Sequence, residues 1–120
     1  MRDFMKLEVW RRAHRLVLDI YRATDEYPPD ERFELRSQTR RAAVSVPMNI
    51  AEGAGRNTRA DYARFIDIAA GSTNELEYQL ILSRDLGYLE RRTARGLRDE
   101  TRQVRSMLTT LTKRIAPNRS

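Results

Sequence analysis

The sequence predicts an all-α protein, an antiparallel up-down-up-down four-helix bundle. Apolar residues recur at spacings of three and four along four separate segments, and no segment alternates with a period of two. The connections between these segments are short, which favours packing of successive helices against each other. A chain of 120 residues can bury a core as one domain. We therefore expect a single domain over residues 1–120, with residues 117–120 as a short tail.

The first predicted helix ends at the prolines that follow Tyr27. Its apolar stripe consists of Leu7, Trp10, Ala13, Val17, Ile20 and Thr24. After Pro28 and Pro29, Asp30 is a candidate N-cap, so the second helix is expected to start at about Glu31.

The second predicted helix carries a proline in its apolar half. Residues 40–53 read RRAAVSVPMNIAEG. Pro47 removes one backbone hydrogen bond and its ring clashes with the carbonyl of Ala43, which costs about 3 kcal/mol unless the helix bends. Because the flanking residues are apolar, we predict a kinked helix end that is mostly buried. Arg40 and Arg41 cannot both face away from the core, so one of them is expected to pair across an interface.

Two chemical interpretations of the same stretch are weaker. Gly53 and Gly55 lack the GxxxxGK[ST] pattern and the preceding strand that a phosphate-binding loop needs. Asn49 and Glu52 have no nucleophile or second carboxylate nearby in the sequence. Capping or hydrogen bonding between helices is the expected role of these two side chains.

The third predicted helix is long, and local signals mark both of its ends. Thr58, followed by Asp61 three residues later, resembles a capping box, and Gly87 can supply a left-handed C-cap. Small residues occupy positions 69–73. Gly71, in their middle, costs about 1 kcal/mol relative to alanine in an exposed helix. Close approach by another helix, within the bundle or across a subunit interface, would offset that cost, and we favour the interface.

The fourth predicted helix carries the net charge. The chain has a net charge of +6, yet residues 1–87 hold 14 basic and 14 acidic residues, whereas residues 88–120 hold nine and three. The apolar stripe of this helix consists of Leu97, Thr101, Val104, Leu108, Leu111 and Ile115. Beside it, at steps of four and three, runs a row of arginines that comprises Arg91, Arg95, Arg98, Arg102 and Arg105.

Two interpretations of this arginine row stay open. The guanidinium groups can bind nucleic-acid phosphates, with little sequence preference because no aromatic residue follows Tyr88. Alternatively, their stems cover apolar surface while their heads pair with Glu75 and Glu77 of the preceding helix. Arg56 and Arg59 form a second candidate anion site at the start of the third helix, against the alternative of a solvated loop.

The composition argues against most other classes of function. The chain has no cysteine and a single histidine, His14, so no metal site is expected. No nucleophile–base pair or cofactor-binding loop is evident either, so we expect no catalytic residue and no cofactor. Charges are scattered through the first residues and no apolar run spans a bilayer, so we expect neither a signal peptide nor a membrane protein. The predicted location is cytoplasmic.

Three segments of the sequence resemble one protein family. They are ERFELRSQTRRAAVSVPMNIAEG at 31–53, LEVWRRAHRLVLDIY at 7–21 and FIDIAAGSTNELEYQLILSRDLGYL at 65–89. Together they resemble the four-helix bundles encoded in intervening sequences of bacterial 23S ribosomal RNA genes, a family that includes accessory variability proteins of diversity-generating retroelements. Met48 departs from the small residue expected at what we take to be a buried position. The fourth helix matches only by its hydrophobic period.

The resemblance implies an antiparallel four-helix bundle in a ring-shaped homopentamer. In the retroelement branch it implies a basic ring that binds nucleic acid and supports a reverse transcriptase. We therefore expect a non-enzymatic oligomer that binds DNA, RNA or their hybrid. The alternatives are a protein–protein adaptor ring without a nucleic-acid ligand and, least favoured, an enzyme.

Overall fold

The computed structural model describes residues 2–31 and 34–116, and within these ranges four long helices form a bundle. The helices are α1 (Glu8–Thr24), α2 (Leu35–Ala54), α3 (Arg59–Asp85) and α4 (Arg91–Ile115). Short 3-10 helices precede the first two, η1 (Phe4–Lys6) and η2 (Pro29–Glu31). No strand occurs in the part of the chain that the structure describes. The predicted all-α four-helix bundle is confirmed.

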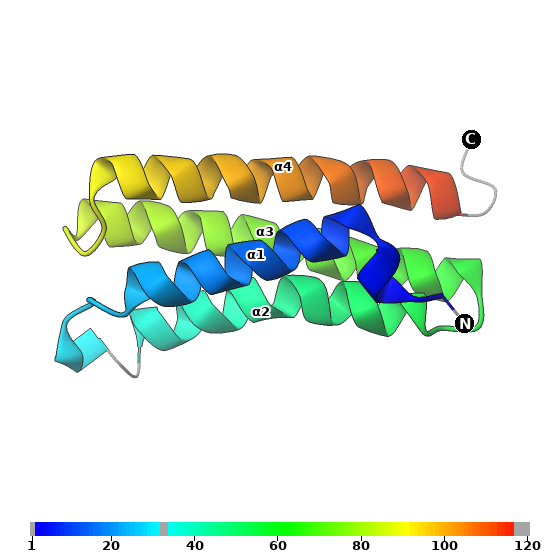
Figure 1. Cartoon of the computed structure of the whole chain (residues 1–120), viewed down its shortest axis with the longest axis horizontal. Helices are drawn as coiled ribbons and strands as arrows, with labels where there is room; N and C mark the ends of the chain where they lie inside the picture. The colour runs from blue at the N-terminus through cyan, green and yellow to red at the C-terminus, as the bar shows by residue number, and fades with distance from the viewer. Residues whose placement is uncertain (1, 32–33, 117–120) are drawn as a thin grey trace.

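The helices lie side by side along a molecule that is 46 Å long, and each runs opposite to the one before it (Figure 1). Helices α1 and α3 each pack against both α2 and α4, so α2 and α4 occupy one diagonal of the bundle. The loops α1–α2 and α3–α4 lie at one end, and the loop α2–α3 lies at the other (Figure 1).

The core contains the apolar stripes that the spacing predicted. Ala13, Ile20, Val104 and Leu108 are among its most buried members. In α1 and α4, apolar and polar residues separate onto opposite faces, whereas in α2 and α3 this separation is weak. A helix with apolar residues on several faces is typically covered on several sides. The outer surfaces of α2 and α3 are therefore the places to look for contacts beyond the single chain.

The start of the second helix was predicted wrongly. Helix α2 begins at Leu35, after Glu34 in the N-cap position, and Asp30 lies instead within η2. Consecutive prolines at 28 and 29 favour a local turn over a helix start. Asp30 was therefore wrongly taken as the N-cap of α2. Residues 32 and 33, which the prediction assigned to this helix, lie outside the described residues.

Helix α2 continues through Pro47, which is buried inside it. Two residues later, the Asn49 side chain donates hydrogen bonds to the Ser45 carbonyl at 2.8 Å and to the Ser45 hydroxyl at 3.0 Å. The Ser45 hydroxyl also shares a 2.8 Å hydrogen bond with Ser72 of α3. Asn49 thus bonds within its own helix, beside the proline, and it is Ser45 that links α2 to α3. The kink itself remains a prediction.

Local signals at the ends of α3 are confirmed. The Thr58 side chain accepts a hydrogen bond from the Asp61 amide at 3.1 Å, and Gly87 adopts a φ of 82° after the helix ends. At the other end of the preceding loop, a Cβ on Gly53 would lie 2.9 Å from the Cβ of Phe65. Gly53 therefore allows the end of α2 to approach the start of α3.

Candidate functional site

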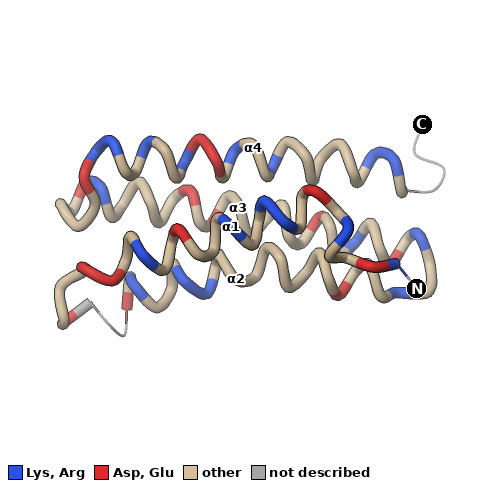
Figure 2. Tube along the Cα trace, in the orientation of Figure 1, with Lys and Arg blue, Asp and Glu red and all other residues tan. Residues whose placement is uncertain are grey.

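The arginine row of α4 divides into two groups with different surroundings. Arg91 and Arg95 are exposed, and no hydrogen bond or ion pair to another described residue involves their side chains. Arg98, Arg102 and Arg105 all bind one residue of α3, Glu77. Figure 2 shows these basic positions along the half of α4 next to the α3–α4 loop. The row thus contains both free cations and paired ones.

Glu77 receives guanidinium groups on both of its carboxylate oxygens. Arg105 donates to Oε1 at 2.6 Å, while Arg102 at 2.8 Å and Arg98 at 3.2 Å donate to Oε2. Burial of Glu77 raises the pKa of its carboxyl, but the hydrogen bonds from Arg105, Arg98 and Arg102 outweigh burial and hold that pKa below its ordinary value. Glu77 is therefore ionised at neutral pH.

Glu75, the other carboxylate predicted to pair with this row, is exposed and forms no ion pair with another described residue. Successive positions on a helix differ by about 100°, so Glu75 and Glu77 point in quite different directions. Only Glu77 faces α4. Three of the five arginines in the row are thus paired within the chain, and all three pair with Glu77.

Arg56 lies at the opposite end of the bundle from Arg91 and Arg95. Its Nε atom contacts Asp61 at 3.2 Å, and its guanidinium group covers the ring of Phe65 at 4.8 Å from the centroid. A weaker contact of 3.9 Å joins it to Glu52. The side chain therefore bridges the turn between α2 and α3 and is already partnered.

Arg59 caps the end of another helix. Its guanidinium group donates to the carbonyl of Ile115 at 3.0 Å and to that of Arg114 at 3.4 Å, both in the last turn of α4. A cation at a helix C-terminus interacts favourably with the helix dipole. Arg56 and Arg59 are thus occupied within the chain and do not join the α4 row.

Arg40 is the member of its pair that bridges helices. It donates to the Thr24 hydroxyl at 2.8 Å, the Tyr21 carbonyl at 2.9 Å and the Asp25 carboxylate at 2.8 Å. Arg41 is exposed and points away. Sequence spacing indicated that only one of the two could face solvent, but not which one.

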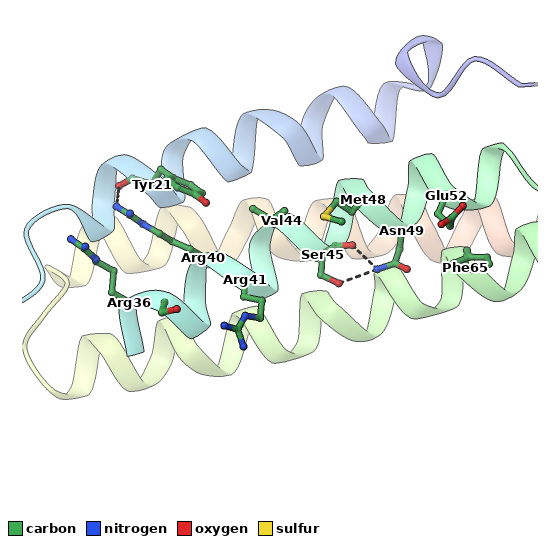
Figure 3. Close-up of a pocket in the computed structure, with 11 residues that line it drawn as sticks. Tyr21, Arg36, Arg40, Arg41, Val44, Ser45, Met48, Asn49, Glu52 and Phe65 are labelled. Carbon is green, nitrogen blue, oxygen red and sulfur yellow. Dashed lines mark hydrogen bonds between the residues drawn. The ribbon is translucent and has the colours of Figure 1, made fainter. Parts of the chain in front are cut away.

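A groove of about 620 Å³ crosses the outer face of α2 and was not foreseen (Figure 3). Tyr21 reaches it from α1 and Phe65 from α3. The remaining lining residues belong to α2 and comprise Arg36, Ser37, Arg40, Arg41, Val44, Ser45, Met48, Asn49 and Glu52. Most of them recur at steps of three and four, and two members of this outward stripe, Val44 and Met48, were assigned to the buried part of the helix from the sequence.

Met48 shows the consequence of that misassignment. The expectation that its position is buried is wrong, because Met48 is 64% exposed. Pro47 and Ile50 face the core on either side of it, so Met48 points outward into the groove. A large apolar side chain in this place gives the groove an exposed apolar contact point.

Three further features concern metal binding, the single histidine and membrane insertion. Across residues 2–31 and 34–116, no group of three or more His, Asp and Glu side chains could hold a metal ion. The ring of His14 stacks on Trp10 with centroids 5.3 Å apart. None of the helices in these ranges has the length and apolar character needed to cross a bilayer.

Comparisons with known proteins agree with the fold. A crystal structure of a protein of unknown function from the S23 ribosomal protein family of Bacteroides thetaiotaomicron VPI-5482 superposes with a TM-score of 0.79. The two sequences are 23% identical, and the match covers 88% of this chain and 98% of the other. No curated protein matches the sequence. The sequence profile of the 23S rRNA-intervening sequence proteins matches residues 5–110. This chain therefore belongs to the family of 23S rRNA-intervening sequence proteins.

Proposed function

We propose that this protein is a non-enzymatic, homo-oligomeric bundle of the cytoplasm that binds the phosphate backbone of nucleic acid through α4. The proposal includes a role as an accessory factor, such as one that supports the reverse transcriptase of a diversity-generating retroelement. The observation that carries it is the exposed part of the arginine row, Arg91, Arg95 and Arg102. The first turn of α4 contains no acidic residue, and Glu90 precedes it in the N-cap position.

The dimensions of the row suit a nucleic-acid backbone. Residues 91 to 102 span about 16 Å at 1.5 Å per residue, which corresponds to roughly five base pairs at 3.4 Å per pair. The row also begins at the N-terminus of α4, where the helix dipole adds partial positive charge. In an oligomer, each subunit would contribute one such row, and simultaneous contacts would raise the affinity.

The test is the affinity for fluorescein-labelled single-stranded DNA, RNA, duplex DNA and hybrid, measured by anisotropy at about 50 mM salt. Arg91→Gln/Arg95→Gln is compared with Lys6→Gln/Arg15→Gln, which removes two exposed charges that lie outside α4. The proposal expects the first variant to lose at least about tenfold more affinity than the second. Equal losses, or a wild-type protein that binds none of the probes, would contradict it.

A second candidate function is a protein–protein adaptor ring that has no nucleic-acid ligand. The groove over α2 favours this alternative, because Met48, Val44 and Tyr21 together present apolar surface on a chain in which a third of the residues are charged. The same surface would serve as the contact between subunits in the oligomer proposed above. An adaptor would use the arginine row for contacts between subunits and leave nucleic acid unbound.

Oligomerisation through the groove is tested by light scattering after size-exclusion chromatography. Met48→Glu places a charge at the centre of the groove, and Leu86→Glu makes the same kind of change at an exposed apolar residue after α3. We expect Met48→Glu to lower the measured mass and Leu86→Glu to leave it unchanged. If both variants keep the wild-type mass, the groove is not the subunit contact.

A further inference from the structure

Three guanidinium groups around one carboxylate form a network with more positive charge than pairing requires. One arginine is enough to neutralise Glu77, yet Arg98, Arg102 and Arg105 all donate to it. The network therefore keeps a surplus of two positive charges. It lies on the surface between α3 and α4, within the row that we propose to contact nucleic acid.

The inner side of this network is held rigidly. Arg105 donates through Nε to the Thr73 hydroxyl at 3.0 Å, and the Thr73 hydroxyl donates to the Ala70 carbonyl at 2.6 Å. Thr73 is fully buried, and the Glu77 side chain is only 13% exposed. Because its partner Arg105 is anchored to the backbone of α3, the Glu77 carboxylate has a fixed position.

The outer side of the network is open. Arg102 uses only Nε toward Glu77, and its side chain is 55% exposed. Its two terminal nitrogens donate no hydrogen bond to any residue that the structure describes. Arg98 likewise reaches Glu77 through Nε and Nη2, which leaves Nη1 without a bond to a described acceptor. A guanidinium group is planar, so fixing Nε also fixes the direction of the remaining N–H groups.

We propose that Arg102 and Arg98 form a binding site for a backbone phosphate, and that Glu77 positions the two arginine side chains. This inference rests on the proposed function, and it adds a role for an acidic residue within a basic surface. Glu77 orders two long side chains before the ligand arrives, so less conformational entropy is lost on binding. The terminal N–H groups of Arg102 can then contact a phosphate in the bidentate manner typical of arginine.

A simpler view of Glu77 predicts the opposite result. If Glu77 only neutralises the arginines, then Glu77→Gln adds positive charge and tightens nucleic-acid binding. If Glu77 positions them, the same change weakens binding, although the protein becomes more positive. Glu75→Gln is the matched control, because Glu75 is exposed on the same helix and has no ion-pair partner among the described residues.

The experiment measures anisotropy of a labelled 20-nucleotide single-stranded DNA and its duplex at about 50 mM salt. We expect Arg102→Gln and Glu77→Gln each to weaken binding by about threefold or more, and Glu75→Gln to tighten it slightly. Because Glu77 is proposed to act through Arg102, the two changes should not add. The double variant Glu77→Gln/Arg102→Gln should have about the affinity of whichever single variant binds less tightly. Circular dichroism at the assay temperature checks that each variant remains folded.

Arg102→Lys gives a second test in which Glu77 itself is unchanged. Lysine keeps the charge but lacks the planar fork, so binding should weaken nearly as much as in Arg102→Gln. Wild-type affinity in Arg102→Lys, or tighter binding in Glu77→Gln than in Glu75→Gln, would overturn this inference. If Arg91→Gln/Arg95→Gln still weakens binding in that case, the proposed function stands alone. If the wild-type protein binds neither probe, both this inference and the proposed function are wrong.

Discussion

Arg105 and Glu77 join α4 to α3 through a hydrogen-bonded ion pair of 2.6 Å between Nη2 and Oε1. The side chain of Arg105 is 26% exposed and that of Glu77 is 13% exposed. Arg105 therefore has a structural role in the single chain, in contrast to Arg91 in the same row. This difference separates residues that hold the bundle together from residues that are free to bind a ligand.

Arg105→Met should lower the free energy of unfolding by about 2 kcal/mol. The change removes the hydrogen bonds to Glu77 and Thr73, while the methionine keeps most of the packing. Their combined contribution is reduced to about 2 kcal/mol because Arg105 is partly exposed and Arg98 and Arg102 still neutralise Glu77. Arg91→Met is the control and should change stability by less than about 0.5 kcal/mol. Urea unfolding followed by circular dichroism measures both, and equal effects would contradict the division of the row.

The stability that Glu77 provides should depend on pH. Its pKa is lowered in the folded protein, so its ionised form contributes stability that is fully present above the unfolded value of about 4.3. That contribution is lost as the pH falls through the lower folded pKa. The gap in unfolding free energy between wild type and Glu77→Gln should thus be constant from pH 7 to 5 and shrink toward pH 3. A gap that widens on acidification would rule out this account.

Arg40→Lys should destabilise the contact between α1 and α2 by about 1–2 kcal/mol. An ammonium group cannot reach the Thr24 hydroxyl, the Tyr21 carbonyl and the Asp25 carboxylate in the geometry of a guanidinium fork. Arg41→Lys alters the neighbouring, exposed residue and should change stability by less than about 0.5 kcal/mol. Thermal unfolding of the two variants compares them directly, and the expectation fails if Arg41→Lys is the more damaging change.

Two glycines should respond oppositely to alanine. A Cβ on Gly53 would lie 2.9 Å from Phe65, so Gly53→Ala should cost about 1–3 kcal/mol. A Cβ on Gly71 would meet nothing within 4 Å, so Gly71→Ala should stabilise the isolated chain by up to about 1 kcal/mol. Urea unfolding of both variants tests the signs, and a destabilising Gly71→Ala would show that this position is covered by another subunit.

Much of the fold could be predicted because it follows from periodicity and short-range signals. The spacing of apolar residues located four helices, and the Thr58 cap and Gly87 marked two boundaries correctly. The start of α2 could not be located in the same way, because residues 28–30 carry a proline turn and a capping residue together. Local propensity gives no means to decide between them.

The candidate site was less predictable because its behaviour depends on which partner each cation finds. Spacing placed five arginines in a row but could not show that one carboxylate, Glu77, binds three of them. It also could not show that Arg59 caps the distant end of α4. The position of Met48 was mistaken for core, since periodicity alone does not tell an apolar contact surface from a buried face.

The salt dependence of nucleic-acid binding by wild type and Arg91→Gln/Arg95→Gln shows whether α4 contacts phosphates. Each phosphate contact contributes about 0.7 to the slope of log K against log salt for a single strand and about 0.9 for a duplex. We predict a steep slope for the wild type. In the variant, which lacks two arginines per subunit, the slope should be smaller by about 1.4 (single strand) to 1.8 (duplex) for each subunit that contacts the nucleic acid. Parallel slopes for the two proteins would contradict the claim that α4 is the phosphate-binding surface.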